Sequence, residues 1–416
     1  MSQVKDAALA PQGKKKLALA AANMPVVEKI AQRFETQKPF AGKKIACCLH
    51  VTKETAILMR ALKRGGAEVA LCGSNPLSTQ DDVAAALAEQ DIHVYAWRGI
   101  NNEDYYKAVN QALDIKPDVV IDDGADLINT LHTSRRELLP GIVGGQEETT
   151  TGVIRLKAMA ADKKLEFAVI AVNDSRTKHW FDNFYGTAQG TLDAIMRSTN
   201  TLISGKTLVV AGYGWCGKGM AQKARGMGAN VIVCEVDPVL ALVAHMDGFS
   251  VKPMDEAARV GDIFVTVTGD KDVLRKRHFE SMKDGAILAN SGHFDCEINV
   301  QELRAMSASV DTVRDNLEAF SLEDGRTLYL IGQGRLSNLA AAEGHSSEIM
   351  DLSFADQALA AEFLFKNAGT LAPGVHVLPD QLDRDVAQMK LDALGVKIDV
   401  LTPDQEKYLQ SWQEGT

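Results

Sequence analysis

The sequence predicts an α/β protein built from two doubly wound parallel-sheet domains and a short C-terminal tail. The chain has 416 residues, which at about 100–200 residues per domain suggests two or three domains. Short apolar runs alternate with segments of helical periodicity, which is the pattern of β-α-β units. Near the middle of the chain, a glycine-rich turn lies between an apolar run and a helical segment.

The first half of the chain alternates predicted strands and helices. Strands are expected at residues 44–49, 67–71, 94–97, 119–121 and 167–172, and helices at 14–33 (interrupted at Met24-Pro25), 52–64, 83–88 and 103–112. In a parallel sheet, ligands bind beyond the carboxyl ends of the strands. Because His50, Asp123 and Asn173 follow predicted strands, the sequence indicates a ligand site at this edge.

The second half begins with a helix predicted over residues 187–204, which joins the two units. Another alternating unit runs from residue 206 to about 339, and helical periodicity returns at 341–366. A short extended stretch is expected at 374–379, followed by polar helix and tail.

The composition excludes several classes of function. Lys and Arg number 45 and Asp and Glu 55, so the net charge of −10 argues against binding to nucleic acid or to a membrane surface. No window holds the ~18 apolar residues of a membrane span, and the apolar run after Lys16 is shorter than the ~7–15 residues of a signal peptide. The six cysteines form no CxxC pair and no Cys/His metal spacing, so we expect a reducing compartment, no disulfide framework and no metal site.

The glycine-rich turn has the features of a dinucleotide site. Gly212, Gly214 and Gly217 form a GxGxxG pattern after the apolar run 207–211, and Glu235 ends the next predicted strand. The glycines allow a tight turn and a close backbone approach to a pyrophosphate, which the following helix N-terminus attracts. Glu235 would bind ribose hydroxyls and repel a 2′-phosphate, so NAD is predicted rather than NADP. The alternative is a turn with only a packing role; the spacing of a Walker P-loop is absent.

Three polar motifs of the first unit each have an ordinary structural interpretation. Glu148 could sit at a helix N-terminus, Asp123 could belong to a turn, and Lys178 could be a solvated charge. These structural interpretations become less convincing when the motifs are taken together, because they occur in one order in a chain that also has a dinucleotide turn.

The ordered motifs carry a resemblance to a known family. They are the segments 78–82, 94–97, 147–152, 173–175, 181–183, 211–214, 235–238, 292–295 and 374–379. Over about residues 20–410 the chain closely resembles the S-adenosylhomocysteine hydrolases. The segment 340–345 resembles the short archaeal and thermophilic-bacterial branch of that family, which also includes enzymes acting on S-inosylhomocysteine.

The resemblance implies reversible cleavage of S-adenosylhomocysteine to adenosine and homocysteine. Tightly bound NAD oxidises the ribose 3′-hydroxyl, the C4′ proton is lost, homocysteine leaves, water adds, and the ketone is reduced again. It further implies a cytoplasmic homotetramer of the methyl cycle that acts on small molecules, with no nucleic-acid or membrane partner.

The resemblance also assigns roles to individual residues. The implied catalytic residues are His50, Asp123, Glu148, Lys178 and Asp182. Lys178 would be the base at the 3′-oxygen, which requires a lowered pKa, while His50 and Asp123 would move protons at C4′ and C5′. Implied substrate contacts are Thr52, Glu54, His293 and His345. Implied cofactor contacts are Thr149, Thr150, Thr151, Asn183, Gly212, Gly214, Gly217, Glu235, Thr268, Asn290, Gly292 and Asn338, with no metal ligand.

The resemblance also suggests a division of the chain. We expect a substrate domain at 1–186 closed by a returning segment at 346–378, an NAD domain at 187–345, and a C-terminal tail at 379–416.

Some positions depart from the family pattern. Trp215 and Cys216 stand where Asp and Val are usual, and Val267, Thr187 and Glu343 replace Thr, Cys and Met. The chain also ends before the Lys- and Tyr-bearing tail with which longer members reach a neighbouring subunit's NAD.

Three alternatives stay open at this point. Glu54 could accept a hydrogen bond from either adenine or hypoxanthine, so S-inosylhomocysteine is the main alternative substrate. A catalytically silent NAD-binding regulator and a plain NAD dehydrogenase are the other two.

Overall fold

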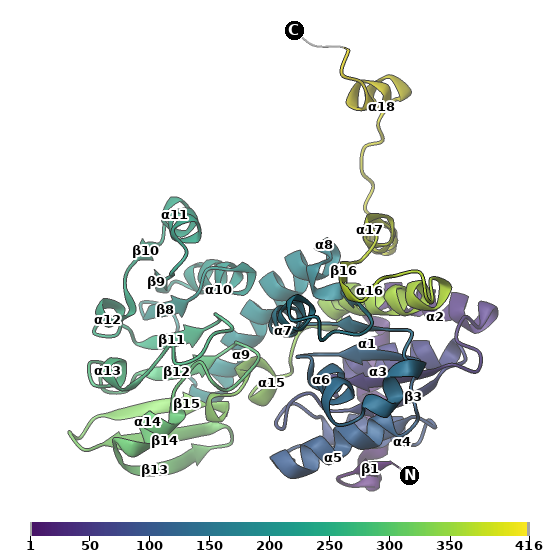
Figure 1. The fold of residues 1–416 in the computed structure, drawn as a ribbon. Coiled ribbons are helices and arrows are strands. Elements are labelled where there is room, and N and C mark those ends of the chain that lie inside the picture. Colours follow the sequence, from purple (N-terminus) through teal and green to yellow (C-terminus); the bar gives the residue numbers. More distant parts are fainter. Residues whose placement is uncertain (1, 414–416) are drawn as a thin grey trace.

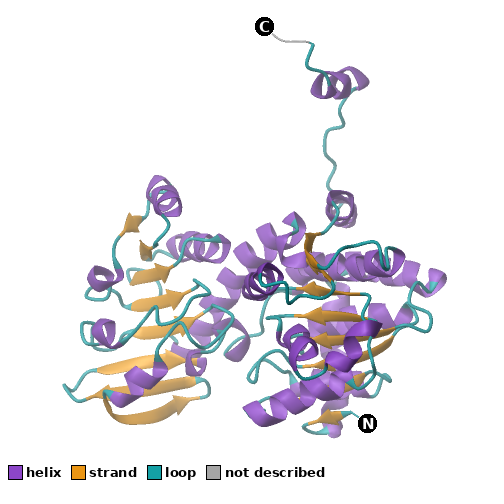
Figure 2. Ribbon diagram, in the orientation of Figure 1, coloured by secondary structure: helices purple, strands orange, loops and turns teal. Residues whose placement is uncertain are grey.

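Two eight-stranded sheets, each lined by helices, make up the computed structural model, which describes residues 2–413 (Figures 1 and 2). The first sheet has the order β1-β4-β3-β2-β5-β6-β7-β16, and all its strand pairs are parallel. Its strands are β1 (Gln3–Val4), β2 (Lys44–Cys48), β3 (Glu68–Cys72), β4 (His93–Ala96), β5 (Val119–Asp122), β6 (Gly144–Glu147), β7 (Ala168–Ala171) and β16 (Gly374–Val377).

Side chains of the first sheet alternate between two buried faces. Ile45 and Cys47 of β2 pack on one face, whereas Ala46 and Cys48 pack on the other. The first face is covered by α1 (Ala10–Ala22), α2 (Pro25–Gln37), α3 (Lys53–Arg64), α4 (Asp81–Ala88), α16 (Ser347–Lys366) and α17 (Asp380–Leu394), and the second by α5 (Asn102–Leu113), α6 (Asp126–Thr133) and α7 (Thr150–Ala161). Because both faces are buried, the central residues of β2, β3, β5 and β7 are apolar, as expected of a doubly wound sheet.

The second sheet has the order β10-β9-β8-β11-β12-β15-β14-β13. Its strands are β8 (Thr207–Ala211), β9 (Asn230–Cys234), β10 (Ser250–Val251), β11 (Ile263–Thr266), β12 (Ile287–Asn290), β13 (Ser307–Arg314), β14 (Leu317–Leu322) and β15 (Thr327–Ile331). One face packs on α9 (Thr187–Thr199), α10 (Trp215–Gly226) and α11 (Pro238–Met246), and the other on α12 (Met254–Ala257), α13 (Lys276–Phe279) and α14 (Val300–Ala305).

The predicted fold class is confirmed, with one difference in strand direction. β13, β14 and β15 pair antiparallel, so the second sheet is mixed rather than wholly parallel. Short turns join these strands, and two-stranded hairpins of this kind need no crossover helix. β6 was not predicted because its sequence, Gly144–Glu147, lacks the β-branched residues typical of strands, although all four residues are buried.

Two predicted helices are longer than the helices in the structure. The helix expected at 187–204 ends at Thr199, because Asn200 adopts the left-handed conformation that ends a helix. The segment 341–366 is not one helix: α15 (Ser337–Ala340) ends before Gly344, which has a φ of +85°, and α16 starts only at Ser347.

Each sheet has a central point where the strand order changes direction, and at such a point the loops separate to leave room for a ligand. In the first sheet this point lies between β2 and β5, which are followed by His50 and Asp123. In the second sheet it lies between β8 and β11, which are followed by Gly212 and Thr268. Figure 1 shows the two sheets side by side with α9 between them.

A continuous helical segment connects the two sheets. It consists of α8 (Arg176–Lys178), the π-helix η4 (His179–Gly186) and α9. The wider π-helical turn brings residues five apart onto one face, so Lys178 and Asn183 meet there. Between residues 2 and 413, no helix is both long and apolar enough to cross a membrane.

Gly219 and Gly226 both lie on α10 but have different surroundings. A Cβ atom at Gly219 would come within 2.0 Å of the Phe184 carbonyl oxygen in η4, whereas one at Gly226 would meet no atom within 4 Å. We expect Gly219→Ala to push α10 away from η4 and lower the free energy of unfolding by about 1–3 kcal/mol. Gly226→Ala is the matched control and should be neutral or stabilising by up to about 1 kcal/mol. Chemical denaturation measures both, and equal stabilities would contradict the packing described here.

Candidate active site

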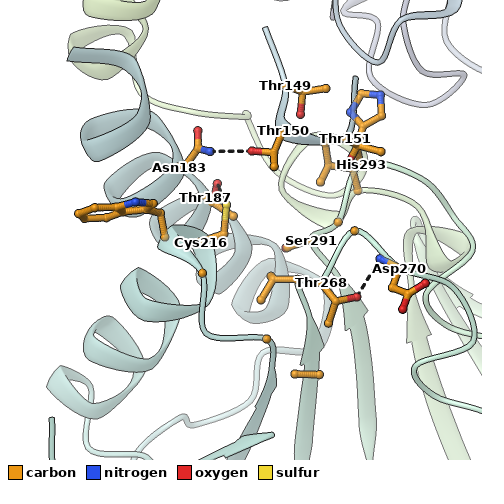
Figure 3. Close-up of a pocket in the computed structure, with 18 of the residues that line it drawn as sticks. Thr149, Thr150, Thr151, Asn183, Thr187, Cys216, Thr268, Asp270, Ser291 and His293 are labelled. Atoms are coloured by element: carbon orange, nitrogen blue, oxygen red, sulfur yellow. Dashed lines mark hydrogen bonds between the residues drawn. The ribbon is translucent and has the colours of Figure 1, made fainter. Parts of the chain in front are cut away.

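A cavity of about 1110 Å³ is lined by residues that follow strands of both sheets. The predicted site residues that line it are His50, Thr52, Asp123, Glu148, Thr149, Thr150, Thr151, Lys178, Asp182, Asn183, Gly212, Gly214, Glu235, Thr268, Gly292, His293, Asn338 and His345. Figure 3 shows part of this wall, with Thr150 and Asn183 on one side and Thr268 on the other. Three predicted residues, Glu54, Gly217 and Asn290, do not line the cavity.

Lys178 lies at the centre of a buried polar cluster. Its Nζ donates to Asn183 Oδ1 at 2.7 Å and to Asn173 Oδ1 at 3.0 Å. The same ammonium lies 2.9 Å from Asp182 Oδ2 and 3.8 Å from Glu148 Oε1. All these side chains are at least nine-tenths buried, so their hydrogen bonds fix the Lys178 side chain in one place.

The charge state of Lys178 differs from the sequence-based expectation. Burial by itself lowers the pKa of Lys178, but Asp182 and Glu148 outweigh it and raise the pKa above its usual range. The lowered pKa that a lysine base requires is therefore absent from this arrangement. The prediction that Lys178 is a base did not include the effect on its pKa of the two carboxyl groups within 4 Å of the ammonium.

Asp182 and Glu148 respond to the same cluster in opposite ways. Burial opposes ionisation of Asp182, but Lys178 and His345 together hold its pKa below the usual range. Burial raises the pKa of Glu148 to about 8, because only one cation lies near it while Asp182 and Asp123 add negative charge. The cluster therefore pairs a stable carboxylate with a carboxyl group that holds a proton near neutral pH.

A second polar group lies beyond the carboxyl ends of β2 and β5. His50 Nε2 lies 3.2 Å from Asp123 Oδ2, and His50 Nδ1 lies 2.8 Å from Ser78 Oγ. Burial lowers the pKa of His50 to about 4, so the ring is neutral near pH 7. A carboxylate accepts hydrogen bonds only, so Nε2 donates to Asp123 and Nδ1 accepts from Ser78.

His293, from the loop after β12, reaches the same carboxylate from the second sheet. Its Nδ1 lies 3.7 Å from Asp123 Oδ1. Candidate ligand atoms of His50, Asp123 and His293 all lie within 4.8 Å of one another, close enough to hold a metal ion. Sequence spacing predicted no metal site, because these residues are far apart in the chain.

The residues expected to contact the nucleobase do not all line the same cavity. Thr52 lines the main cavity and caps α3. Glu54 is buried, accepts from Ser347 Oγ at 2.7 Å, and lines a neighbouring cavity of about 670 Å³. Both ring nitrogens of His345 are engaged, Nδ1 with Asp182 and Nε2 with Asn338 Nδ2 at 2.8 Å.

The glycine-rich turn has the geometry of a phosphate cradle. Gly212 has a φ of +102°, which L side chains rarely adopt, and a Cβ at Gly217 would come within 1.9 Å of the Gly212 carbonyl oxygen. A Cβ at Gly214 would enter open space, and no side chain caps α10 there. The first-turn N–H groups of α10 thus remain available to an anion, so the turn fits a dinucleotide pyrophosphate.

Glu235 lies at the end of β9, beside this turn. Its Oε2 accepts from the Tyr213 backbone N–H at 2.6 Å, and its Oε1 accepts from those of Val236 and Asp237. These bonds fix the carboxylate at the edge of the cavity, where its remaining lone pairs fit ribose hydroxyls.

Glu297 fixes the loop that faces the turn, although the sequence analysis did not single it out. Its carboxylate accepts from the N–H groups of Thr268 and Gly269 and from Thr268 Oγ1. Its partners lie 28 and 29 residues away in the chain, so no local signal could identify it. Asn290 has a similar supporting role, because its amide donates to three backbone carbonyls below the cavity.

The departures at the turn have distinct contacts. Trp215 stacks on Trp180 with ring centroids 5.9 Å apart and meets His179 edge-on. Cys216 Sγ lies 3.6 Å from Thr187 Oγ1, so the two unusual residues contact each other. Both contacts join the start of α10 to the helical segment that carries Lys178.

Comparison with known proteins gives a consistent family. The family model described as S-adenosyl-L-homocysteine hydrolase matches residues 1–139, and the model of its NAD-binding domain matches residues 183–344.

Relatives match along the whole chain. An adenosylhomocysteinase from Aquifex aeolicus is 58% identical over 414 residues, covering 99% of each chain. One from Thermococcus kodakarensis is 56% identical over 413 residues, covering 99% of this chain and 98% of the relative. An S-inosyl-L-homocysteine hydrolase from Methanocaldococcus jannaschii is 55% identical over 416 residues, covering all of both chains.

The two family models contain His50, Asp123 and the glycine turn, and the full-length relatives also cover Glu148, Lys178 and Asp182, which lie between the two models. The chain therefore belongs to the S-adenosyl-L-homocysteine hydrolase family, as an enzyme with that family's NAD-binding domain.

Proposed function

We propose that the chain catalyses the reversible hydrolysis of S-adenosyl-L-homocysteine to adenosine and L-homocysteine. The observation that carries this proposal is that the buried Lys178 cluster and the glycine turn line one cavity. Net hydrolysis needs no redox cofactor, so a dinucleotide turn facing a lysine and two carboxyl groups indicates a redox step within the reaction. Bound NAD would supply the chemistry of that step, as the acceptor and later the donor of a hydride at ribose C3′.

The glycine turn and the facing loops are proposed to hold the cofactor. Gly212 and Gly214 would admit the pyrophosphate, while Gly217 keeps α10 close enough to the turn for its N–H groups to reach it. Glu235 would bind the adenosine ribose. Further contacts are assigned to Thr149, Thr150, Thr151, Asn183, Thr268, Gly292 and Asn338, and Asn290 would act by supporting Gly292.

Lys178, Asp182 and Glu148 are proposed to surround the substrate ribose. Carboxyl groups bind vicinal hydroxyls well, and the Lys178 ammonium stabilises the negative charge that develops on the 3′-oxygen as its proton leaves. For Lys178 itself to accept that proton, its ammonium must first lose one, which Asp182 and Glu148 oppose. Ribose hydroxyls that hydrogen-bond to both carboxyl groups would weaken the attraction of these groups for the ammonium. The neutral amine of Lys178 is therefore expected only in the substrate complex.

His50 and Asp123 are proposed to exchange protons at C4′ and C5′. The neutral ring of His50 and the carboxyl of Asp123 lie 3.2 Å apart, so a proton can pass between them without a large movement. His293 contacts the same carboxyl from the second sheet. A proton path that includes both sheets would be complete only when the cavity is closed, which also keeps a keto intermediate from leaving the site.

The identity of the nucleobase is the finer part of the proposal. Glu54 lines the neighbouring cavity, which His345 also lines, and a nucleobase that reaches this cavity could donate to Glu54 from the adenine amino group or from N1–H of hypoxanthine. The relative from Methanocaldococcus jannaschii is named for the inosyl substrate. S-adenosylhomocysteine is our primary assignment, and S-inosylhomocysteine is the alternative.

We also propose a homotetramer located in the cytoplasm and acting in the methyl cycle. The arm that carries α18 (Pro403–Gln410) extends away from the sheets (Figure 1) and exposes Val400, Leu409 and Trp412. Exposed apolar side chains on a projecting arm support contact with a second copy of the chain.

The division into a substrate domain (1–186 and 346–378), an NAD domain (187–345) and a tail (379–416) is kept as a proposal. It is supported by the return of α16 and β16 to the first sheet. Residues 1 and 414–416 of these ranges lie outside the described residues.

Release of a free thiol tests the function directly. Purified protein is incubated with S-adenosylhomocysteine and, separately, with S-inosylhomocysteine, and homocysteine is measured with a thiol reagent. We expect thiol from the adenosyl substrate with no net formation of NADH. Thiol from the inosyl substrate alone would replace the primary assignment, and thiol from neither would leave a silent NAD-binding protein.

Substitution of Lys178 tests its role at the ribose. Lys178→Ala should lower homocysteine release by about 10²–10⁴-fold, the usual contribution of a proton-transfer group. Most bound NAD should remain, because Nζ bonds to Asn183 among the proposed cofactor contacts but to no residue of the glycine turn. Lys157→Ala, which removes an exposed lysine paired with Asp174, is the control. Turnover near that of the wild type in Lys178→Ala would refute the assignment.

The neutral state of His50 has a consequence for stability. Its pKa is about 4 in the folded protein and about 6.5 in an unfolded chain, so the unfolded chain binds more protons between these values. The associated stability is fully present above about pH 6.5 and is lost as the pH falls toward 4. Between pH 7.5 and pH 5, the wild type should lose about 2 kcal/mol that His50→Gln does not lose. Urea denaturation at both pH values measures this difference, and parallel losses would contradict it.

A further inference from the structure

A buried amide lies directly behind Glu148. Gln357 of α16 is fully buried and does not line the cavity, and its Nε2 donates to Glu148 Oε2 at 2.5 Å. The other carboxyl oxygen of Glu148, Oε1, has no hydrogen-bond partner among the described residues and lies 3.8 Å from Lys178 Nζ. The two oxygens of Glu148 thus have different surroundings.

The orientation of the Gln357 amide is set by a second buried amide. Gln146 of β6 satisfies its neighbours only with its oxygen toward the Ala361 N–H, at 2.8 Å, and its nitrogen toward the side-chain and main-chain oxygens of Gln357. A backbone N–H can only donate, so this row of amides has one direction. The end of the row that meets Glu148 is therefore always an N–H donor.

This direction determines where Glu148 can carry a proton. In a protonated carboxyl group the carbonyl oxygen is a better hydrogen-bond acceptor than the hydroxyl oxygen, so the oxygen that accepts from the Gln357 N–H at 2.5 Å is favoured as the carbonyl oxygen. A proton on Glu148 therefore sits on Oε1, the oxygen on the side of Lys178. If the amides were reversed, the proton would sit on Oε2 and point away from the cavity.

We propose that Gln357 is a positioning residue, which holds Glu148 by Oε2 and leaves Oε1 as the one oxygen that exchanges a proton with the substrate ribose. This inference rests on the function proposed above for Glu148, and it adds the residue that selects the active oxygen. Gln357 itself touches neither the cavity nor Lys178.

Four charged or titratable groups face Glu148. Lys178 and Asp182 approach from the connecting helical segment, Asp123 from the loop after β5, and Asp356 from α16. The Gln357 N–H is the only hydrogen-bond donor to the Glu148 side chain among the described residues. Its hydrogen bond lowers the pKa of Glu148, which burial raises to about 8.

Infrared titration tests the inference without using the reaction. The carboxyl C=O band of Glu148 is identified as the difference between the wild type and Glu148→Gln, and its intensity is followed with pH. In Gln357→Leu the carboxylate loses its donor, so the midpoint should rise by about one pH unit or more. In Gln357→Glu two carboxyl groups share one proton, so the band should titrate in two steps with the upper step above the wild-type midpoint.

Asp351→Asn is the matched control for damage to α16. Asp351 is also fully buried on α16, but its partners are the Val26 and Val27 N–H groups and Lys390 Nζ rather than Glu148. This variant should lower stability and leave the midpoint of Glu148 unchanged. If Gln357→Leu does not fold, Gln357→Glu, which keeps the size and shape of the side chain, decides the result.

Two results would overturn the inference. One is an unchanged midpoint in both Gln357 variants. The other is a shift of the pH profile of homocysteine release by Gln357→Leu that persists in a Glu148→Gln background, because the effect must act through Glu148. Failure of the proposed function appears separately, as a wild-type protein that titrates normally at Glu148 but releases no homocysteine.

Discussion

The buried ammonium of Lys178 is the interaction on which the arrangement of the cavity depends. A cation enclosed by protein is stable only when carboxylates and hydrogen-bond acceptors surround it. Asp182, Asn183, Asn173 and Glu148 supply these groups from the connecting helical segment, the end of β7 and the end of β6. Each of these residues is itself buried, so removing the ammonium would leave several polar groups without their partner.

The connecting helical segment links this cluster to the cofactor side. The π-helix η4 brings Asn183 back to Lys178, and the Phe184 carbonyl, in the same π-helix, packs against Gly219 of α10. Trp215 and Cys216 add contacts between the start of α10 and the same segment. A change in the glycine turn is therefore transmitted to the residues around Lys178 through direct packing.

Each sheet contributes one chemical half of the site. The first sheet places titratable groups beyond β2, β5, β6 and β7, and the second places the glycine turn and Glu235 beyond β8 and β9. His293 contacts Asp123, and His345 contacts Asp182. Both histidines come after the glycine turn in the chain. The division explains why a net hydrolysis can be carried out by an enzyme with a dinucleotide-binding domain.

The sequence by itself determined the fold class, most strands of the first sheet and the glycine turn. Alternation of apolar runs and helical segments depends on local burial, and the turn requires glycines at fixed positions, so both are visible in the order of residues. It did not predict β6, because Gly144–Glu147 forms a strand only by pairing with β5 and β7. It also did not predict the antiparallel β13–β15 edge, or that Gly344 would separate α15 from α16.

Only the tertiary structure decided the electrostatics of the site. Motif order indicated His50, Asp123, Glu148, Lys178 and Asp182, but the charge on Lys178 depends on carboxylates at 2.9 and 3.8 Å. Glu297 and Gln357 act on residues up to 209 positions away in the chain, so no local pattern reveals them. The physical reason is that a pKa and a hydrogen-bond partner depend on distances through space, whereas a sequence pattern records only the spacing of residues along the chain.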